Sequence, residues 1–221
     1  DKMIKKSSFT QRHNINVTGG SEKTRFYTSV GFLDQNGIYK VGDDNYKQLN
    51  SRINVENQTT DWMKLGFKAL YNYSTQDKPH TYQGKDVWER VVFSLPTDFI
   101  DAWQKDPRYP ELDKFAGMYS QNNAYAILDN AGRKKYDQHD IWMTATADFD
   151  ILKGWKAHVD FNYNLNYEKA SDHSKPIKFF DGSFNETYGE TVVNNFVMNN
   201  YNTSYYSFNA YTEYENTFAE K

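Results

Sequence analysis

Cysteine is absent from this chain of 221 residues, which excludes both a disulfide framework and thiolate catalysis. No stretch approaches the roughly 18 consecutive apolar residues that mark a membrane-spanning helix. Positive charge is not in excess either, because the net charge is −3 and no basic stripe or block occurs. Nucleic acid is therefore not expected as a partner. Residues 1–6 are polar and do not form a signal peptide, so we expect that processing or truncation removed one.

Enzyme signatures are also missing from the sequence. It has no nucleophile elbow, no phosphate-binding glycine loop and no zinc-binding histidine pair at helical spacing. Its five histidines are widely separated, and His158 is predicted to be a polar wall residue. The run Asp43, Asp44 and Asn45 is interpreted as a solvated hairpin tip, because its spacing fits no EF-hand calcium loop. No catalytic residue, metal or cofactor is predicted.

Aromatic residues are abundant, with 18 Tyr, 15 Phe and 5 Trp, and this bias favours strands over helices. The mean hydropathy of −0.90 is low for a membrane protein. A transmembrane β-barrel accommodates this value, because only every second side chain of its strands faces lipid.

Two adjacent segments alternate strictly between apolar and polar residues, which is the period of a β-strand. In residues 155–167, aromatic and aliphatic residues occupy the odd positions from Trp155 to Tyr167. In residues 140–151 the apolar positions run from Ile141 to Ile151, and Trp142 is the exception on the polar side. The connection at 152–154 is short enough only for a hairpin turn.

Five further strands are expected, at residues 13–17, 26–32, 49–55, 65–73 and 206–214. The connections alternate in length, short at 19–24, 60–63 and 152–154, medium at 35–46, and long at 77–137 and 171–200. All the short turns therefore fall at the same end. The sequence predicts an all-β fold, an antiparallel up-and-down transmembrane β-barrel segment with long extracellular loops at 77–137 and 171–200. A soluble all-β domain with one solvent-exposed face also shows alternating apolar and polar residues. In the two strands with the clearest alternation, however, every Lys, Asp and Glu falls on one side.

Several segments resemble the barrel of SusC/RagA-type TonB-dependent transporters. They are residues 17–27 (VTGGSEKTRFY), 29–38 (SVGFLDQNGI), 61–66 (DWMKLG), 152–155 (LKGW) and 206–211 (YSFNAY). The resemblance implies that residues 1–221 are part of a barrel of roughly 22 strands with a plugged lumen, the plug domain and the C-terminal strands being absent from this chain. It also implies active import of an oligosaccharide or peptide across the outer membrane. The implied partners are outer-membrane lipid, a SusD-like lipoprotein and TonB, the last through parts of the parent chain.

The loop at 77–137 is the predicted cargo surface, because long connections are usually functional. A short helix is expected at 84–95, followed by Phe99 and a mixture of aromatic and charged side chains that suits sugar rings or peptide groups. The candidate cargo-binding residues are Asp101, Trp103, Arg108, Tyr109, Tyr119 and Tyr125. Alternatively, these aromatic residues pack the loop over the barrel mouth or contact the lipoprotein. Arg52, Lys64, Lys68, Glu213 and Glu215 are expected to line the lumen.

Two other functions remain open from the sequence. One is a soluble or surface-attached glycan-binding β-protein, which detergent dependence separates from a transporter. The other is a passive porin, which shares the strand pattern but has no plug or TonB-contacting segment upstream.

Overall fold

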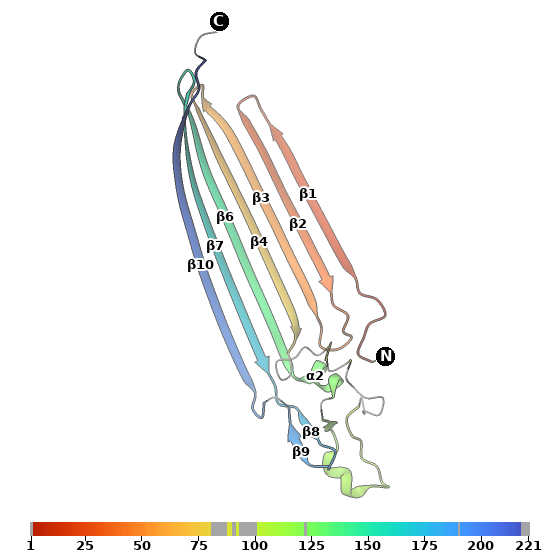
Figure 1. Ribbon diagram of the computed structural model, residues 1–221. Coiled ribbons are helices and arrows are strands. Elements are labelled where there is room, and N and C mark those ends of the chain that lie inside the picture. The colour runs from red at the N-terminus through yellow and green to blue at the C-terminus, as the bar shows by residue number, and fades with distance from the viewer. Residues whose placement is uncertain are drawn as a thin grey trace.

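A computed structural model of the chain describes residues 2–80, 88–89, 92, 101–121, 123–189 and 191–217. Seven strands form one antiparallel sheet in the order β1-β2-β3-β4-β6-β7-β10, so each strand pairs with the next long strand along the chain (Figure 1). This confirms the predicted antiparallel, up-and-down arrangement. The long strands are β1 (Thr10–Gly20), β2 (Thr24–Asn36), β3 (Asn45–Thr60), β4 (Met63–Pro79), β6 (Gly132–Leu152), β7 (Trp155–Ser174) and β10 (Asn195–Tyr214).

The two ends of the sheet differ in their connections. Residues 21–23, 61–62 and 153–154 make tight turns at one end, here called the turn end. The opposite loop end holds the connections 37–44, 80–131 and 175–194, and Figure 1 shows α2, β8 and β9 gathered there. The turn at Gly154 requires glycine, because φ is +77° and an added Cβ would lie 2.1 Å from the carbonyl oxygen of Glu215.

The strands at the loop end are longer than the alternation of residues indicated. β4 continues to Pro79 and β6 begins at Gly132, so the connection expected at 77–137 covers 80–131. Likewise the connection expected at 171–200 covers 175–194. In these extensions both faces carry polar residues, which leaves no alternation to read. Ion pairs join the strands instead: Arg133 Nη2 lies 2.8 Å from Asp77 Oδ1, and Lys134 Nζ lies 3.1 Å from Asp172 Oδ2.

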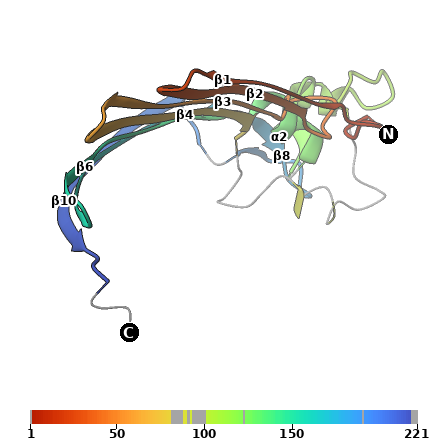
Figure 2. The ribbon, with the colours of Figure 1, turned by 90° about the horizontal axis from the view of Figure 1, so that it is seen from above.

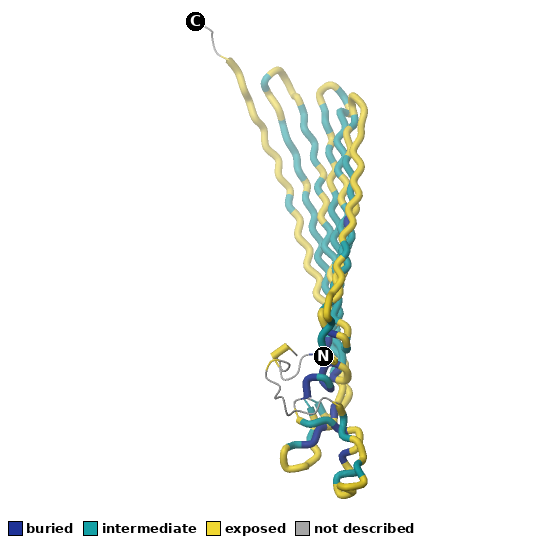
Figure 3. The backbone as a smooth tube through the Cα atoms, turned by 90° about the vertical axis from the view of Figure 1, so that its right-hand side faces the viewer, coloured by how far each residue is buried: buried dark blue, intermediate teal, exposed yellow. Residues whose placement is uncertain are grey.

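The sheet is curved rather than flat. Figure 2 shows it bending in an arc from β1 to β10, with α2 and β8 on the inner side of the arc near the loop end. Along the described strands most of the tube is exposed or intermediate, and the buried residues concentrate at the loop end (Figure 3). Among the described residues, none of the buried hydrophobic side chains belongs to the seven-stranded sheet.

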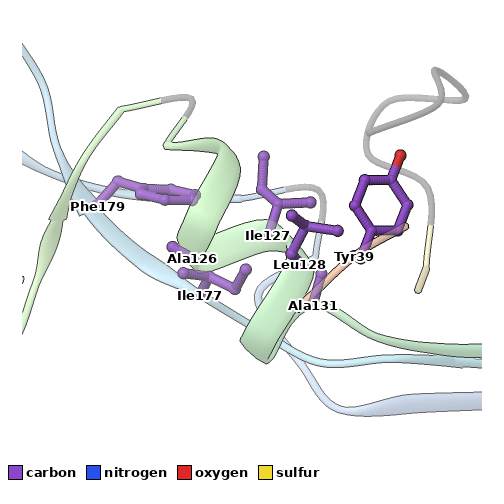
Figure 4. Close-up of a cluster of buried hydrophobic side chains, with 7 residues drawn as sticks. All are labelled: Tyr39, Ala126, Ile127, Leu128, Ala131, Ile177 and Phe179. Carbon is purple, nitrogen blue, oxygen red and sulfur yellow. The ribbon is translucent and has the colours of Figure 1, made fainter. Parts of the chain in front are cut away.

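The hydrophobic core lies instead in the connections. The helix α2 (Ala124–Asn130) packs with residues of two other connections, and Figure 4 shows this cluster. Its buried members are Tyr39, Ala126, Ile127, Leu128, Ala131, Ile177 and Phe179. A small sheet formed by β5 (Tyr119–Ser120), β8 (Lys178–Phe180) and β9 (Glu186–Tyr188), and the 3₁₀ helix η1 (Pro110–Phe115), complete this folded layer. No helix in the described part of the chain has the length and apolar character to cross a membrane.

The helix α2 has a side-chain N-cap. The Ala126 backbone N–H donates to Asn123 Oδ1 at 2.9 Å, and Asn123 is itself buried. Removing this acceptor by Asn123→Ala should cost about 1 kcal/mol of local stability. We expect faster hydrogen exchange over residues 123–131 in the full-length protein, measured by mass spectrometry, with Asn123→Ser retaining most of the protection. Equal exchange in the two variants would show that the cap does not stabilise the helix.

Candidate functional site

One face of the seven-stranded sheet is apolar over the part of the long strands nearer the turn end. The strand register places on this apolar face Ile15, Val17, Phe26, Val30, Phe32, Leu49, Ile53, Val55, Leu65, Phe67, Ala69, Tyr71, Ile141, Met143, Ala145, Ala147, Phe149, Val159, Phe161, Tyr163, Leu165, Tyr206, Phe208 and Ala210. No Lys, Arg, Asp or Glu interrupts this band. Many of its large side chains are exposed, which water disfavours at about 25 cal/mol per Å² of apolar surface.

Aromatic residues border the band at both ends. At its loop-end border Tyr71 Oη lies 2.8 Å from His139 Nδ1, and the ring of Tyr73 lies 4.7 Å from the His139 ring. At its turn-end border Trp62 stacks on Phe149 with the ring centroids 6.1 Å apart. Met63 to Tyr73 covers about 33 Å at 3.3 Å per residue, or about 25 Å in height at a strand tilt of about 40°. That height equals the apolar band of transmembrane barrels.

Charged residues return on the same face beyond the loop-end border. Asp137, Lys135 and Asp77 follow within a few residues of His139 and Tyr73. Tyr73 Oη donates to Asp137 Oδ1 at 3.4 Å. The Tyr73 side chain therefore connects the apolar band with the charged residues beyond it. An apolar band, an aromatic border and then charged residues follow one another along the strands, which is the order found on the lipid-facing surface of transmembrane barrels.

The opposite, polar face carries a hydrogen-bond network. Thr144 Oγ1 donates to Asn162 Oδ1 at 2.7 Å, and Asn162 Nδ2 donates to Ser207 Oγ at 3.3 Å, which links β6, β7 and β10. Near the turn end, His158 Nδ1 lies 2.8 Å from Asp148 Oδ1 and its ring stacks on Tyr211 at 4.7 Å. His158 is thus a side chain of the polar wall, at the place the sequence predicts.

The residues expected in the lumen lie on the polar face, with one exception. Arg52, Lys64, Lys68 and Glu213 all occupy polar-face positions, and Lys64 Nζ lies 3.3 Å from Glu56 Oε2. Glu215 lies beyond the end of β10, where its backbone N–H donates to the carbonyl of Gly154 at 2.7 Å. It therefore belongs to the turn end rather than to the wall.

The candidate cargo-binding residues do not form one cluster. Trp103 packs edge-on against Phe180, 6.1 Å between centroids, beside buried Phe115. Tyr119 packs against the α2 cluster, and burial raises its pKa. Tyr125 is half-buried on α2. Trp103 and Tyr119 thus contribute to packing of the loop layer, and cargo contact by these three residues stays a prediction.

The remaining candidates are exposed at the loop end. Asp101 Oδ2 pairs with Lys2 Nζ at 2.6 Å. Arg108 holds Asp106 with two guanidinium nitrogens, and its guanidinium lies 5.7 Å from the Tyr109 ring centroid. The Arg108 hydrogen bond holds the pKa of Asp106 below its usual value and raises that of Arg108. Of the expected helix at 84–95, Trp88, Glu89 and Val92 are helical; its other residues, and Phe99, lie outside the described residues.

An apolar band on one face, a polar network on the other and folded connections at one end are the features of a transmembrane β-barrel wall. The comparisons with known proteins agree with this class. The TonB-dependent receptor P26 of Formosa agariphila is 28% identical over 104 residues, 47% of this chain and 10% of that protein. The TonB-dependent receptor P39 of the same organism is 28% identical over 74 residues, 34% of this chain and 7% of that protein. No family model matches the chain.

Solved structures match the fold over almost the whole chain. The RagAB peptide importer in the open-open state superposes with a TM-score of 0.70 at 19% identity, covering 99% of this chain and 23% of that one. The closed-closed state of the same importer superposes with a TM-score of 0.68 at 17% identity, covering 100% of this chain and 23% of that one. This chain is therefore similar to a segment of a SusC/RagA-like TonB-dependent receptor, which confirms the resemblance seen in the sequence, and it spans about a quarter of the length of the RagAB chains.

Proposed function

We propose that the chain is part of the wall of an outer-membrane receptor that imports a nutrient by TonB-dependent active transport. The observation that carries this proposal is the charge-free apolar band, whose height fits the hydrocarbon core of a membrane. In this proposal the seven strands belong to a plugged barrel of roughly 22 strands. The turn end faces the periplasm, and the connections 80–131 and 175–194 form the extracellular surface.

The proposed cargo is an oligosaccharide or a peptide, captured with the help of a SusD-like surface lipoprotein. The similarity to TonB-dependent receptors supports the transport class, and the similarity to a peptide importer supports a peptide as one cargo class. At the extracellular surface, Arg108 and Tyr109 are the exposed pair that offers a cation and an aromatic face to cargo. Asp101 adds a carboxylate in the same loop.

The first test is the location and size of the parent polypeptide. We expect it in the detergent-solubilised outer-membrane fraction, with an intact mass several times the 26.0 kDa of this chain, and peptide mapping should place a plug domain upstream. A mature, detergent-independent chain of the size of this segment would contradict the proposal and favour the glycan-binding β-protein.

The second test is energy coupling in cells that grow on the imported nutrient. Deleting the TonB-contacting segment of the parent should abolish uptake of labelled oligosaccharide or peptide, because the plug then cannot be displaced. The control is the same deletion strain complemented with the intact parent. Uptake that persists without TonB would indicate a passive porin.

A further inference from the structure

The polar face divides into two sectors of opposite charge. On β1 to β4, the described positions of this face carry Arg12, Arg25, Arg52, Lys64, Lys68 and Lys78, with Glu56 as their one carboxylate. On β6, β7 and β10 they carry Asp140, Asp148, Asp150, Asp160, Glu168, Asp172 and Glu213, against Lys134, Lys156 and His158. The polar face therefore has a basic sector on β1 to β4 and, next to it, an acidic sector on β6, β7 and β10.

Trp142 lies at the junction of the two sectors. It is the one aromatic residue that breaks the alternation of its segment, and its side chain is 43% exposed on the polar face. Its Nε1 donates to Asp140 Oδ2 at 2.9 Å, and Asn164 Nδ2 donates to Asp140 Oδ1 at 2.8 Å. One Asp140 oxygen thus accepts from the indole and Asn164 holds the other, so the Trp142 ring is oriented through a hydrogen-bonded carboxylate.

Beside the Trp142 ring lie two cations with no carboxylate directly opposite them on the neighbouring strands. Across its strand pairs, Arg52 faces Ser29 on β2 and Leu70 on β4. Lys68 faces Asn54 on β3 and Thr144 on β6. Among the described residues neither cation forms an ion pair. Because like charges on neighbouring positions repel, an anion between Arg52 and Lys68 would lower the free energy of this part of the wall.

These residues line an open hollow on the polar face, here called the Trp142 pocket. Its volume is about 310 Å³, and it is lined by Arg52, Asn54, Lys68, Ala69, Leu70, Trp142 and Thr144. A neighbouring hollow of about 510 Å³ shares Arg52 and Leu70 with it and extends along the basic sector to Tyr27 and Arg12. Between them the two hollows are lined by cations, by amides and by the rings of Tyr27 and Trp142.

The pocket lies at mid-height of the apolar band. Arg52 and Lys68 neighbour Ile53 and Ala69, which face the other way at the centre of the band. The side chains of Arg52 and Lys68 lie on the polar face, which in a transmembrane barrel lines the lumen, where an anionic ligand would meet them.

We propose that the Trp142 pocket is a binding site for carboxylate-bearing cargo, in which Arg52 and Lys68 bind the carboxylate and the Trp142 ring stacks on an adjacent planar or apolar group. The inference rests on the proposed transport function and names its substrate class. Acidic sugars and acidic peptides share this carboxylate chemistry.

The test measures binding to the purified full-length receptor in detergent by isothermal titration calorimetry. The probes are trigalacturonate and triglutamate, with maltotriose and triglutamine as their neutral counterparts. We expect at least one acidic probe to bind at least ten-fold more tightly than its neutral counterpart, and Arg52→Gln combined with Lys68→Gln to remove that preference. Which acidic probe binds distinguishes a sugar from a peptide cargo.

Matched variants separate this role from a structural one. Lys64→Gln removes a cation of the same sector that is already paired with Glu56, so it should leave probe binding unchanged. Arg52→Lys keeps the charge and should retain most of the binding, and heat-modifiable electrophoresis reports whether each variant is folded. The proposal is overturned if no acidic probe binds or if the double variant binds the probes like the wild type. It is also overturned if the double variant makes the plug more susceptible to proteolysis without changing the affinity for the probes.

The outcomes also distinguish this inference from the proposed function. TonB-dependent uptake of a neutral cargo, with no preference for acidic probes, would reject the inference and leave the transport function intact. Acidic-probe binding that depends on Arg52 and Lys68, together with uptake that is independent of TonB, would support the site and reject active transport.

Discussion

An arginine in place of Phe208 should strongly reduce the amount of folded receptor in the membrane. Phe208 lies on the apolar face, 65% exposed, in one row with Phe161, Ala145 and Phe67 across four strands. This row is near the middle of the band, where an arginine facing lipid costs about 2 to 4 kcal/mol. The expected result is a loss of the heat-modifiable, folded form from the outer-membrane fraction, measured by electrophoresis.

The neighbouring residue provides the matched control. Asn209 is next in the chain but lies on the polar face, opposite Asp160. Asn209→Arg should therefore leave the folded fraction close to that of the wild type, because the new cation meets water and a carboxylate. If Asn209→Arg abolishes folding and Phe208→Arg does not, the two faces have been assigned the wrong way round.

Truncation of Phe179 should unfold the loop layer while leaving the sheet intact. The Phe179 side chain, from β8 of the small sheet, is 0% exposed and packs in the cluster with α2 (Figure 4). Phe→Ala substitutions at such sites cost about 3 to 5 kcal/mol. Because the buried cluster contains no residue of the long strands, the loss should stay local.

Hydrogen exchange followed by mass spectrometry measures this effect in the full-length receptor. Phe179→Ala should speed exchange in residues 123–131 and 175–189 and leave β3, β4, β6 and β7 protected. Phe179→Leu fills much of the same volume and serves as the control. Uniform deprotection of sheet and loops in Phe179→Ala would show that the two parts fold as one unit.

The faces of the sheet were predictable from the sequence because two signals coincide there. In residues 155–167 the alternation has the strand period, and all charged residues of this segment fall on one face. Tight turns such as the one at Gly154 then set the register of each hairpin. The position of Trp142 was also visible in advance, since it breaks this pattern.

The loop layer was not predictable in the same way. Its strands β5, β8 and β9 have three residues or fewer, too few to show a period. Trp103 and Tyr119 were assigned to a cargo surface from the length of their connection and their residue type, and the structure packs them against separate clusters that are assembled from connections distant in sequence. The charge sectors of the polar face could have been found by counting charges at alternate positions of each expected strand.

The concentration of the folded connections at one end determines the order of assembly. Each hairpin, such as β6–β7, closes locally through its tight turn, whereas β4 and β6 pair across the long connection 80–131. Under the proposed function both long connections lie outside the membrane, so they have to cross the bilayer before the α2 cluster can form, because polar backbone without partners is not tolerated in hydrocarbon. The loop layer would then be the last part of this segment to fold.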